Sequence, residues 1–211
     1  MRLFENSSHL LRKVVIPIKE HSISAKKNTF LSRKIPNSKE RKLLISFLLL
    51  SVILVLTGLL YISINHQELM SQDFRHYKGT FKQLGSISRI GFFAALSIYP
   101  VFWVLKQKQL KTLQLGQIQI KPLVQSIAKI VRKWHVPVGL LSAGIVFLHS
   151  FLALIRGFKV NFTYLSGIGA IIVLLFLMVM GINRFKRTDR NWHLKLAIAF
   201  LVLFMLHATF A

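Results

Sequence analysis

The sequence contains no cysteine and only six acidic residues among its 211 positions. Without cysteine, the chain cannot form a disulfide bond, bind an iron–sulfur cluster through thiolates or hold a haem covalently through a C-x-x-C-H motif. Its long apolar runs contain no aspartate or glutamate, the groups that usually build proton relays and cation pathways in membranes. No G-x-G-x-x-G or other nucleotide-binding signature is present. These absences exclude thiolate-based sites and argue against a carboxylate relay or a nucleotide-binding enzyme.

Hydrophobic residues are what the chain has in abundance. They make up 53% of it, whereas charged residues make up 17%. The apolar residues gather into runs of about 20, the length of a helix that crosses a bilayer. Together they predict an all-α, polytopic membrane helix bundle with five transmembrane helices embedded in a lipid bilayer. The five runs are Leu43–Ile64, Ile87–Leu105, Trp134–Ile155, Phe162–Ile182 and Trp192–Phe210.

Basic residues give the chain a formal net charge of +23. Of the 29 lysines and arginines, 11 lie in residues 1–42, seven in 106–133 and five in 184–195, whereas residues 65–89 and 156–161 contain four and two. By the positive-inside rule we expect a cytoplasmic N-terminus and an outside C-terminus, and we expect the membrane to be the plasma or inner membrane. The excess of basic residues would then determine the membrane topology and attract anionic lipid headgroups. We expect no nucleic-acid partner, because the tail lacks aromatic interleaving and any recognisable module.

Two parts follow from this distribution: a basic cytoplasmic tail, residues 1–42, and a membrane domain, residues 43–211. Because the tail is long and polar, we expect the first apolar run to act as an uncleaved signal anchor. Within the tail, the apolar cluster in Leu10–Ile18 is compatible with a short helix on the membrane surface or with a disordered segment.

The connections between the runs carry further expectations. Residues 65–86 are expected to form a polar loop whose His66 and His76 are solvated, because their irregular spacing does not favour a metal site. The Tyr99-Pro100 step should kink the second span. Residues 118–133 have apolar and polar positions of helical period on opposite faces, which predicts an amphipathic helix on the cytoplasmic surface leading into the third span.

Four histidines form two pairs with identical spacing, His135 with His149 in the third run and His193 with His207 in the fifth. Fourteen residues of α-helix rise roughly 21 Å and end within about 40° of the starting direction. Each helix therefore carries one histidine near each membrane surface, on one face. A histidine alone in a span more often makes an interhelical hydrogen bond, and a separation of roughly 21 Å excludes one zinc site made from all four.

The order of spans predicts how these histidines meet. If the first span runs outward, the third and fifth are parallel, which pairs His135 with His193 and His149 with His207. Two stacked bis-imidazole sites, one in each leaflet, are what two haem groups need for moving electrons across a bilayer. Small residues one turn from a ligand, Gly139 and Ala197, leave room for a porphyrin, and Phe200 lies midway between the two levels.

A short echo precedes one histidine of each helix: Arg132-Lys133-Trp134-His135 and Arg190-Asn191-Trp192-His193. Tryptophan is common at membrane interfaces, so Trp134 and Trp192 alone indicate only anchoring. Placed next to the ligands, with Arg132 and Arg190 close by, they become candidates for flanking a haem and pairing its propionates.

These features resemble the ferric reductase-like transmembrane domain, shared by ferric reductases, NADPH oxidases and the haem subunit of the bacterial methionine-sulfoxide-reducing system. The resemblance covers about residues 43–211 and depends on the spacing of the histidines and the topology. It implies that the four histidines ligate two non-covalent b-type haems, which carry electrons from a cytoplasmic donor to an outside acceptor. Phe200 is similar in position to the family's aromatic residue between the haems.

The chain also departs from that family. Members usually have six spans, and some carry a flavin and nicotinamide domain after the last one, which is not found here. The electron donor is then expected to be a quinol, another subunit or a separate flavoprotein that holds FAD or FMN. The basic segments 106–133 and 184–195 offer such a partner a docking surface. Two alternatives stay open: a haem-free membrane subunit for assembly or transport, and a quinol-oxidising anchor of a larger complex.

Overall fold

The computed structural model describes residues 30–35, 37–116, 118–184 and 190–210. The expectation for Leu10–Ile18 lies outside these residues. The described elements in order are α1 (Phe30–Lys34), α2 (Ser38–Ile64), α3 (His66–Ser71), α4 (Phe74–Leu96), α5 (Ile98–Leu105), the 3-10 turn η1 (Lys108–Lys111), β1 (Gln114–Leu115), β2 (Ile118–Gln119), α6 (Ile120–Ile155), α7 (Phe162–Arg184) and α8 (Arg190–Phe210). The two short strands form an antiparallel hairpin in which Leu115 is opposite Ile118.

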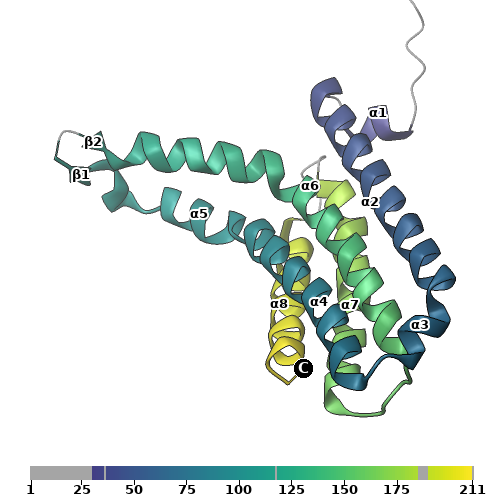
Figure 1. Cartoon of the computed structure of the whole chain (residues 1–211). Coiled ribbons are helices and arrows are strands. Elements are labelled where there is room, and N and C mark those ends of the chain that lie inside the picture. Colours follow the sequence, from purple (N-terminus) through teal and green to yellow (C-terminus); the bar gives the residue numbers. More distant parts are fainter. Residues whose placement is uncertain (1–29, 36, 117, 185–189, 211) are drawn as a thin grey trace, which may run out of the picture.

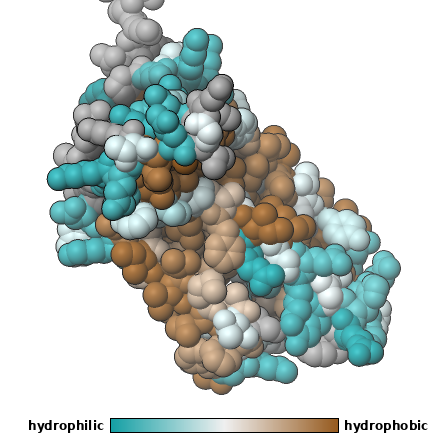
Figure 2. Space-filling view, turned by 90° about the vertical axis from the view of Figure 1, so that its left-hand side faces the viewer, coloured by the Kyte–Doolittle hydropathy of each residue, from teal (hydrophilic) through white to brown (hydrophobic). Residues whose placement is uncertain are grey.

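Five segments of the described chain are long and apolar enough to cross a membrane, which confirms the expected all-α, multi-pass bundle. They are Ser38–Ile64, Arg75–Leu105, Ile120–Ile155, Phe162–Gly181 and Asn191–Phe210. Many of their large hydrophobic side chains are exposed, such as Leu56, Leu60 and Phe176. Figure 2 shows this apolar surface over much of the bundle, with hydrophilic atoms gathered at its upper end and at the lower right. An apolar exterior of this extent suits a lipid environment.

The expectation of a polar loop over residues 65–86 is wrong, because α3 and the first half of α4 occupy this stretch. The helix forms because apolar residues recur on one face, including Tyr77, Phe81 and Leu84, and this face packs against α6 and the end of α2. The Tyr77 hydroxyl donates a hydrogen bond of 2.6 Å to the carbonyl of Leu152. The charged residues on the opposite face hid this pattern.

The second span does break, but ahead of the Tyr99-Pro100 step. The first helix ends at Leu96, and α5 begins at Ile98 with Pro100 in its first turn. Proline has no N–H to donate to the carbonyl four residues earlier and its ring crowds that carbonyl, so the regular helix ends there.

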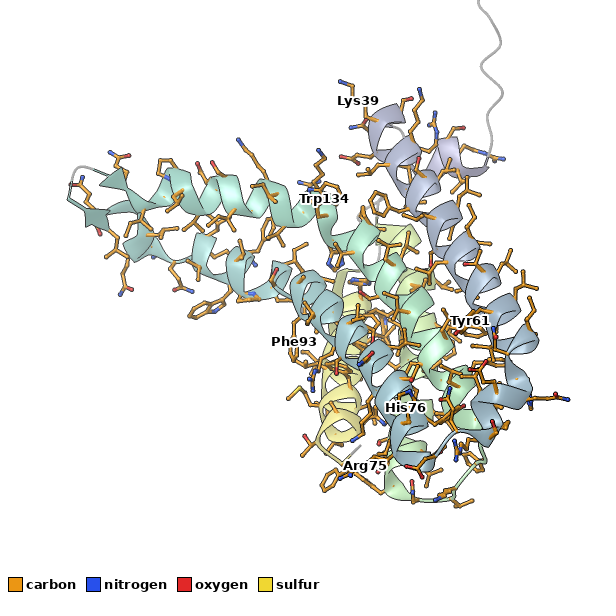
Figure 3. The ribbon with its side chains drawn as sticks, in the orientation of Figure 1. Lys39, Tyr61, Arg75, His76, Phe93 and Trp134 are labelled. Carbon is orange, nitrogen blue, oxygen red and sulfur yellow. The ribbon has the colours of Figure 1, made fainter. Side chains whose placement is uncertain are left out.

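α5, the hairpin and the first half of α6 project sideways from the upper end of the bundle as one arm (Figure 1). The predicted amphipathic helix is confirmed from Ile120 onward, and it continues without a break into the third span through Pro137. Figure 3 shows Trp134 where α6 leaves the arm and turns into the bundle. Proline inside a helix is an established cause of such a kink.

Two groups of helices make the bundle. α2, α4 and α5 pack on α6, while α7 packs on α8. Small residues allow the first group to approach closely, since a Cβ atom at Gly58 would lie 2.5 Å from Leu148. α6 and α8 run in the same direction and both end at the lower end of Figure 1, as expected for the third and fifth spans. They meet through histidine side chains, whose rings are in edge-on contact at two levels.

Candidate functional site

The four histidines meet as two pairs between α6 and α8. The imidazole rings of His135 and His193, the upper pair, have centroids 6.4 Å apart and planes at 74°. Those of His149 and His207, the lower pair, have centroids 6.1 Å apart and planes at the same angle. The pairing is the one that parallel helices with equal spacing predict.

Backbone carbonyl groups hold three of these rings by one nitrogen each. His135 Nδ1 lies 2.8 Å from the carbonyl oxygen of Ala95, and His149 Nδ1 lies 2.7 Å from that of Phe81. His207 Nδ1 lies 2.9 Å from the carbonyl oxygen of Thr163. Because a carbonyl only accepts hydrogen bonds, Nδ1 is the donor in each case, and in the neutral ring Nε2 then keeps its lone pair. This tautomer and this type of second bond are typical of histidines that bind metals.

The spacing within each pair suits one metal ion between the rings. Two imidazoles bound on opposite sides of a metal, with bonds of about 2 Å, have ring centroids roughly 6 Å apart. Among the described residues, no group of three or more histidine, cysteine, aspartate or glutamate side chains could hold a metal. Each pair would offer two imidazole nitrogens to a metal ion, a donor set that would suit a metal whose other ligands come from a macrocycle.

Glycines lie directly against the rings of the lower pair. A Cβ atom at Gly85 of α4 would lie 3.1 Å from His149 Nδ1, and one at Gly167 of α7 would lie 2.9 Å from His207 Nδ1. Each glycine follows by four residues the one whose carbonyl binds the same ring, Phe81 or Thr163. In a helix, residues four apart share one face. The absence of a side chain at the glycine therefore opens the way to the carbonyl.

An aromatic cluster lies between the two pairs along the helices. Phe200 is 3% exposed, stacks on Phe204 with centroids 5.6 Å apart, and meets Phe92 of α4 edge-on at 5.0 Å. The midway position expected for Phe200 is therefore inside the protein. Its neighbour Phe92, also 3% exposed, was not foreseen, because nothing in the sequence shows which helix packs beside Phe200.

Three of the four tryptophan and arginine candidates have exposed side chains, namely Trp134, Trp192 and Arg132. Trp134 is 40% exposed and meets Phe47 of α2 edge-on at 5.7 Å, while Trp192 is 60% exposed with the Lys195 ammonium 4.9 Å from its ring centroid. Arg132 is exposed on the arm, and the side chain of Arg190 lies outside the described residues. Their role beside a haem stays a prediction.

Local sequence could not have identified Gly85 and Gly167. A glycine in a transmembrane helix is common, and only the position of the neighbouring helix shows that a ring lies against it. The same holds for the three carbonyl groups, which every residue possesses.

No protein-family model matches the chain, and no curated protein or solved structure does either. The functional assignment therefore depends on the geometry of the chain's own residues.

Proposed function

We propose that this chain is a dihaem b-type cytochrome that carries single electrons across a cell membrane, as ferric reductase-like proteins do. The observation that supports the proposal most directly is the presence of two facing imidazole pairs, with centroids 6.4 and 6.1 Å apart. One coincidental pair in a helix bundle would be unremarkable. Two pairs with the same spacing, on the same two helices and at the same angle between rings, favour a shared purpose.

In this proposal His135 and His193 hold one haem b, and His149 and His207 hold the other. Held by two histidines, each haem would supply one-electron exchange between ferric and ferrous iron, and ligation by both imidazoles would favour electron transfer over oxygen binding. The carbonyls of Ala95, Phe81 and Thr163 keep each bound ring in one tautomer and one orientation. The histidine rings and the aromatic cluster occupy the space where α6 faces α8.

Apolar side chains occupy the region between the two histidine pairs, which gives this region a low dielectric constant. Phe92, Phe200 and Phe204 fill the space between the pairs with apolar rings, which excludes water from the middle of the bundle. Described acidic residues lie only at the helix ends or connections, at Glu40, Glu68 and Asp73. A proton-conducting chain of carboxylates is thus not part of the proposal.

The direction of transfer follows from charge. The arm and the start of α2 lie at the upper end of the bundle (Figure 1), and the segments there are the most basic, so we propose that this end is cytoplasmic. The donor is a quinol or a separate flavoprotein carrying FAD or FMN, docked on the basic upper end. The acceptor lies outside, beside the lower pair.

The test is to purify the protein from haem-replete cells and to record oxidised and dithionite-reduced spectra with a pyridine haemochrome assay. The proposal predicts two non-covalent haems b per chain with low-spin bis-histidine bands. His76→Ala is a matched control, because this exposed histidine at the lower end of α4 belongs to neither pair and should leave both haems in place. A colourless wild-type protein would instead support the haem-free assembly or transport subunit.

A further inference from the structure

Three basic side chains share one face of α4 inside the second span. Lys78, Lys82 and Arg89 are separated by four and seven residues, which places them within about 40° of one another around the helix. Lys82 and Arg89 are exposed, and Lys78 is half-buried. We call these three residues the basic face of α4.

The basic face is turned toward α8. Phe92 and Phe93, three and four residues after Arg89, flank the direction of the basic face on either side. Both contact Phe204 of α8, with ring centroids 6.0 and 5.7 Å apart, and Phe93 is labelled in Figure 3. The basic face therefore lies on the side of α4 that borders α8, where Lys82 and Arg89 are exposed.

The basic face lies at the depth of the lower pair. Gly85 of α4 touches the ring of His149, and Lys82 and Arg89 lie three and four residues to either side of Gly85. This is a rise of roughly 5 to 6 Å in each direction. Helical side chains lean toward the N-terminus of their helix, which for α4 is the lower end of Figure 1. Arg89 therefore leans toward the level of His149.

Positive charges inside a membrane span need a compensating group. An uncompensated lysine or arginine in a bilayer costs several kcal/mol, so such residues pair with anions or face polar cavities. Within the described part of the chain, no carboxylate lies in the interior of a membrane span. Its acidic residues, Glu40, Glu68 and Asp73, lie at helix termini or in the connection before α4. A bound anionic group can supply the countercharge that the described spans lack.

We infer that the basic face of α4 binds the two carboxylates of the haem held by His149 and His207. This inference rests on the proposed function, which places that haem between α6 and α8, beside the space that the basic face lines. Haem b carries two propionate carboxylates, and Lys82 and Arg89 supply two basic side chains, one on either side of the ring level. A cation at each carboxylate also stabilises the reduced, less positive iron relative to the oxidised iron.

The inference concerns the lower haem and leaves the role expected for Arg132 and Arg190 beside the upper pair unchanged. Arg132 lies three residues before His135 and Arg190 three residues before His193, the two histidines of the upper pair. The propionates that these two arginines are expected to bind are those of the upper haem.

The experiment is a redox titration of the purified haem protein carrying Lys82→Gln, Arg89→Gln or both. We expect the double variant to make reduction of one haem about tenfold less favourable, which for a one-electron couple is about 59 mV, or to lose that haem, while the other haem keeps its potential. Lys82→Arg should restore most of the potential. Lys129→Gln, which removes one positive charge from the exposed surface of the arm, is the control and should change neither haem.

A second background identifies which haem responds. In His149→Ala, the remaining signal belongs to the upper pair, and there the double substitution should have no effect. Unchanged potentials in the wild-type background, or equal shifts of both haems, would overturn the inference and leave the dihaem proposal intact, with an acidic helix of a partner subunit as the remaining source of countercharge. A wild-type protein without haem would overturn the dihaem proposal itself.

Discussion

Gly167 of α7 lies against the imidazole of His207, so that a Cβ atom at this glycine would come within 2.9 Å of Nδ1 and 3.0 Å of Cε1. Real Cβ atoms essentially never lie closer than 3.0 Å to a heavy atom of another side chain. An alanine at this position must therefore displace the ring or the helix. The ring cannot retreat easily, because Nδ1 also donates a hydrogen bond to the carbonyl of Thr163.

Gly167→Ala is therefore expected to weaken the lower haem site selectively. The haem content of the purified variant should fall toward one per chain, or the electron paramagnetic resonance signal of one haem should shift as its ligand ring rotates. Gly79→Ala is the matched control, because a Cβ atom at Gly79 meets nothing within 4 Å and alanine favours the helix. Equal haem content and spectra in both variants would show that Gly167 does not position His207.

Phe200→Ala tests the aromatic cluster between the two levels. Removing a ring that is 3% exposed and stacked on Phe204 leaves a cavity, and such truncations cost about 3 kcal/mol or more in protein cores. The free energy of unfolding in detergent micelles should fall accordingly. Phe176→Ala removes a ring that is 59% exposed on α7 and should cost much less, so equal losses would contradict a packed aromatic core.

The arm offers a test of its contact with lipid. Leu123, Ile127 and Ile130 form an exposed apolar stripe on the first half of α6, which continues to Trp134, whereas Gln125 lies on the opposite side of the helix. An exposed apolar stripe on a basic helix is typical of a helix that lies in the membrane interface.

Because the chain has no cysteine, a single spin label can be placed at either position without other substitutions. In vesicles containing anionic lipid, a label at Ile127→Cys should be relaxed by oxygen, which concentrates in the bilayer. A label at Gln125→Cys should be relaxed by a water-soluble nickel complex. The same response at both positions would show that the arm stands clear of the membrane.

The same lack of cysteine makes the topology directly measurable. Lys39 and His76 lie at opposite ends of the bundle (Figure 3). With the basic end in the cytoplasm, a membrane-impermeant maleimide should label His76→Cys in intact spheroplasts and Lys39→Cys only after permeabilisation. The reverse pattern would invert the proposed direction of electron transfer.

Much of the bundle could be predicted from hydropathy alone, because each span buries its backbone polarity within one helix and exposes apolar side chains to lipid. The boundaries of the helices could not be predicted as well. The second span begins near Arg75 rather than Ile87, since a helix that presents Lys78, Lys82 and Arg89 on one face does not have the uniform hydropathy of a lipid-facing span. That charged face is the feature that most distinguishes α4 from the other spans.

The histidine pairs were foreseen because equal spacing on parallel helices fixes both depth and face. Their partners were not, because Ala95, Phe81 and Thr163 contribute backbone carbonyl groups and Gly85 contributes only the absence of a side chain. Such contacts depend on how α4 sits on α6 and how α7 sits on α8. A pattern within one helix carries no information about them.

The central claim is that each imidazole pair holds one haem, and the measurement that tests it most directly is the haem stoichiometry of two single-ligand variants. His149→Ala and His135→Ala should each retain about one haem per chain by pyridine haemochrome assay, and the two retained haems should differ in midpoint potential, because one comes from the upper pair and the other from the lower. Two haems per chain in both variants, or none in the wild-type protein, would contradict the account.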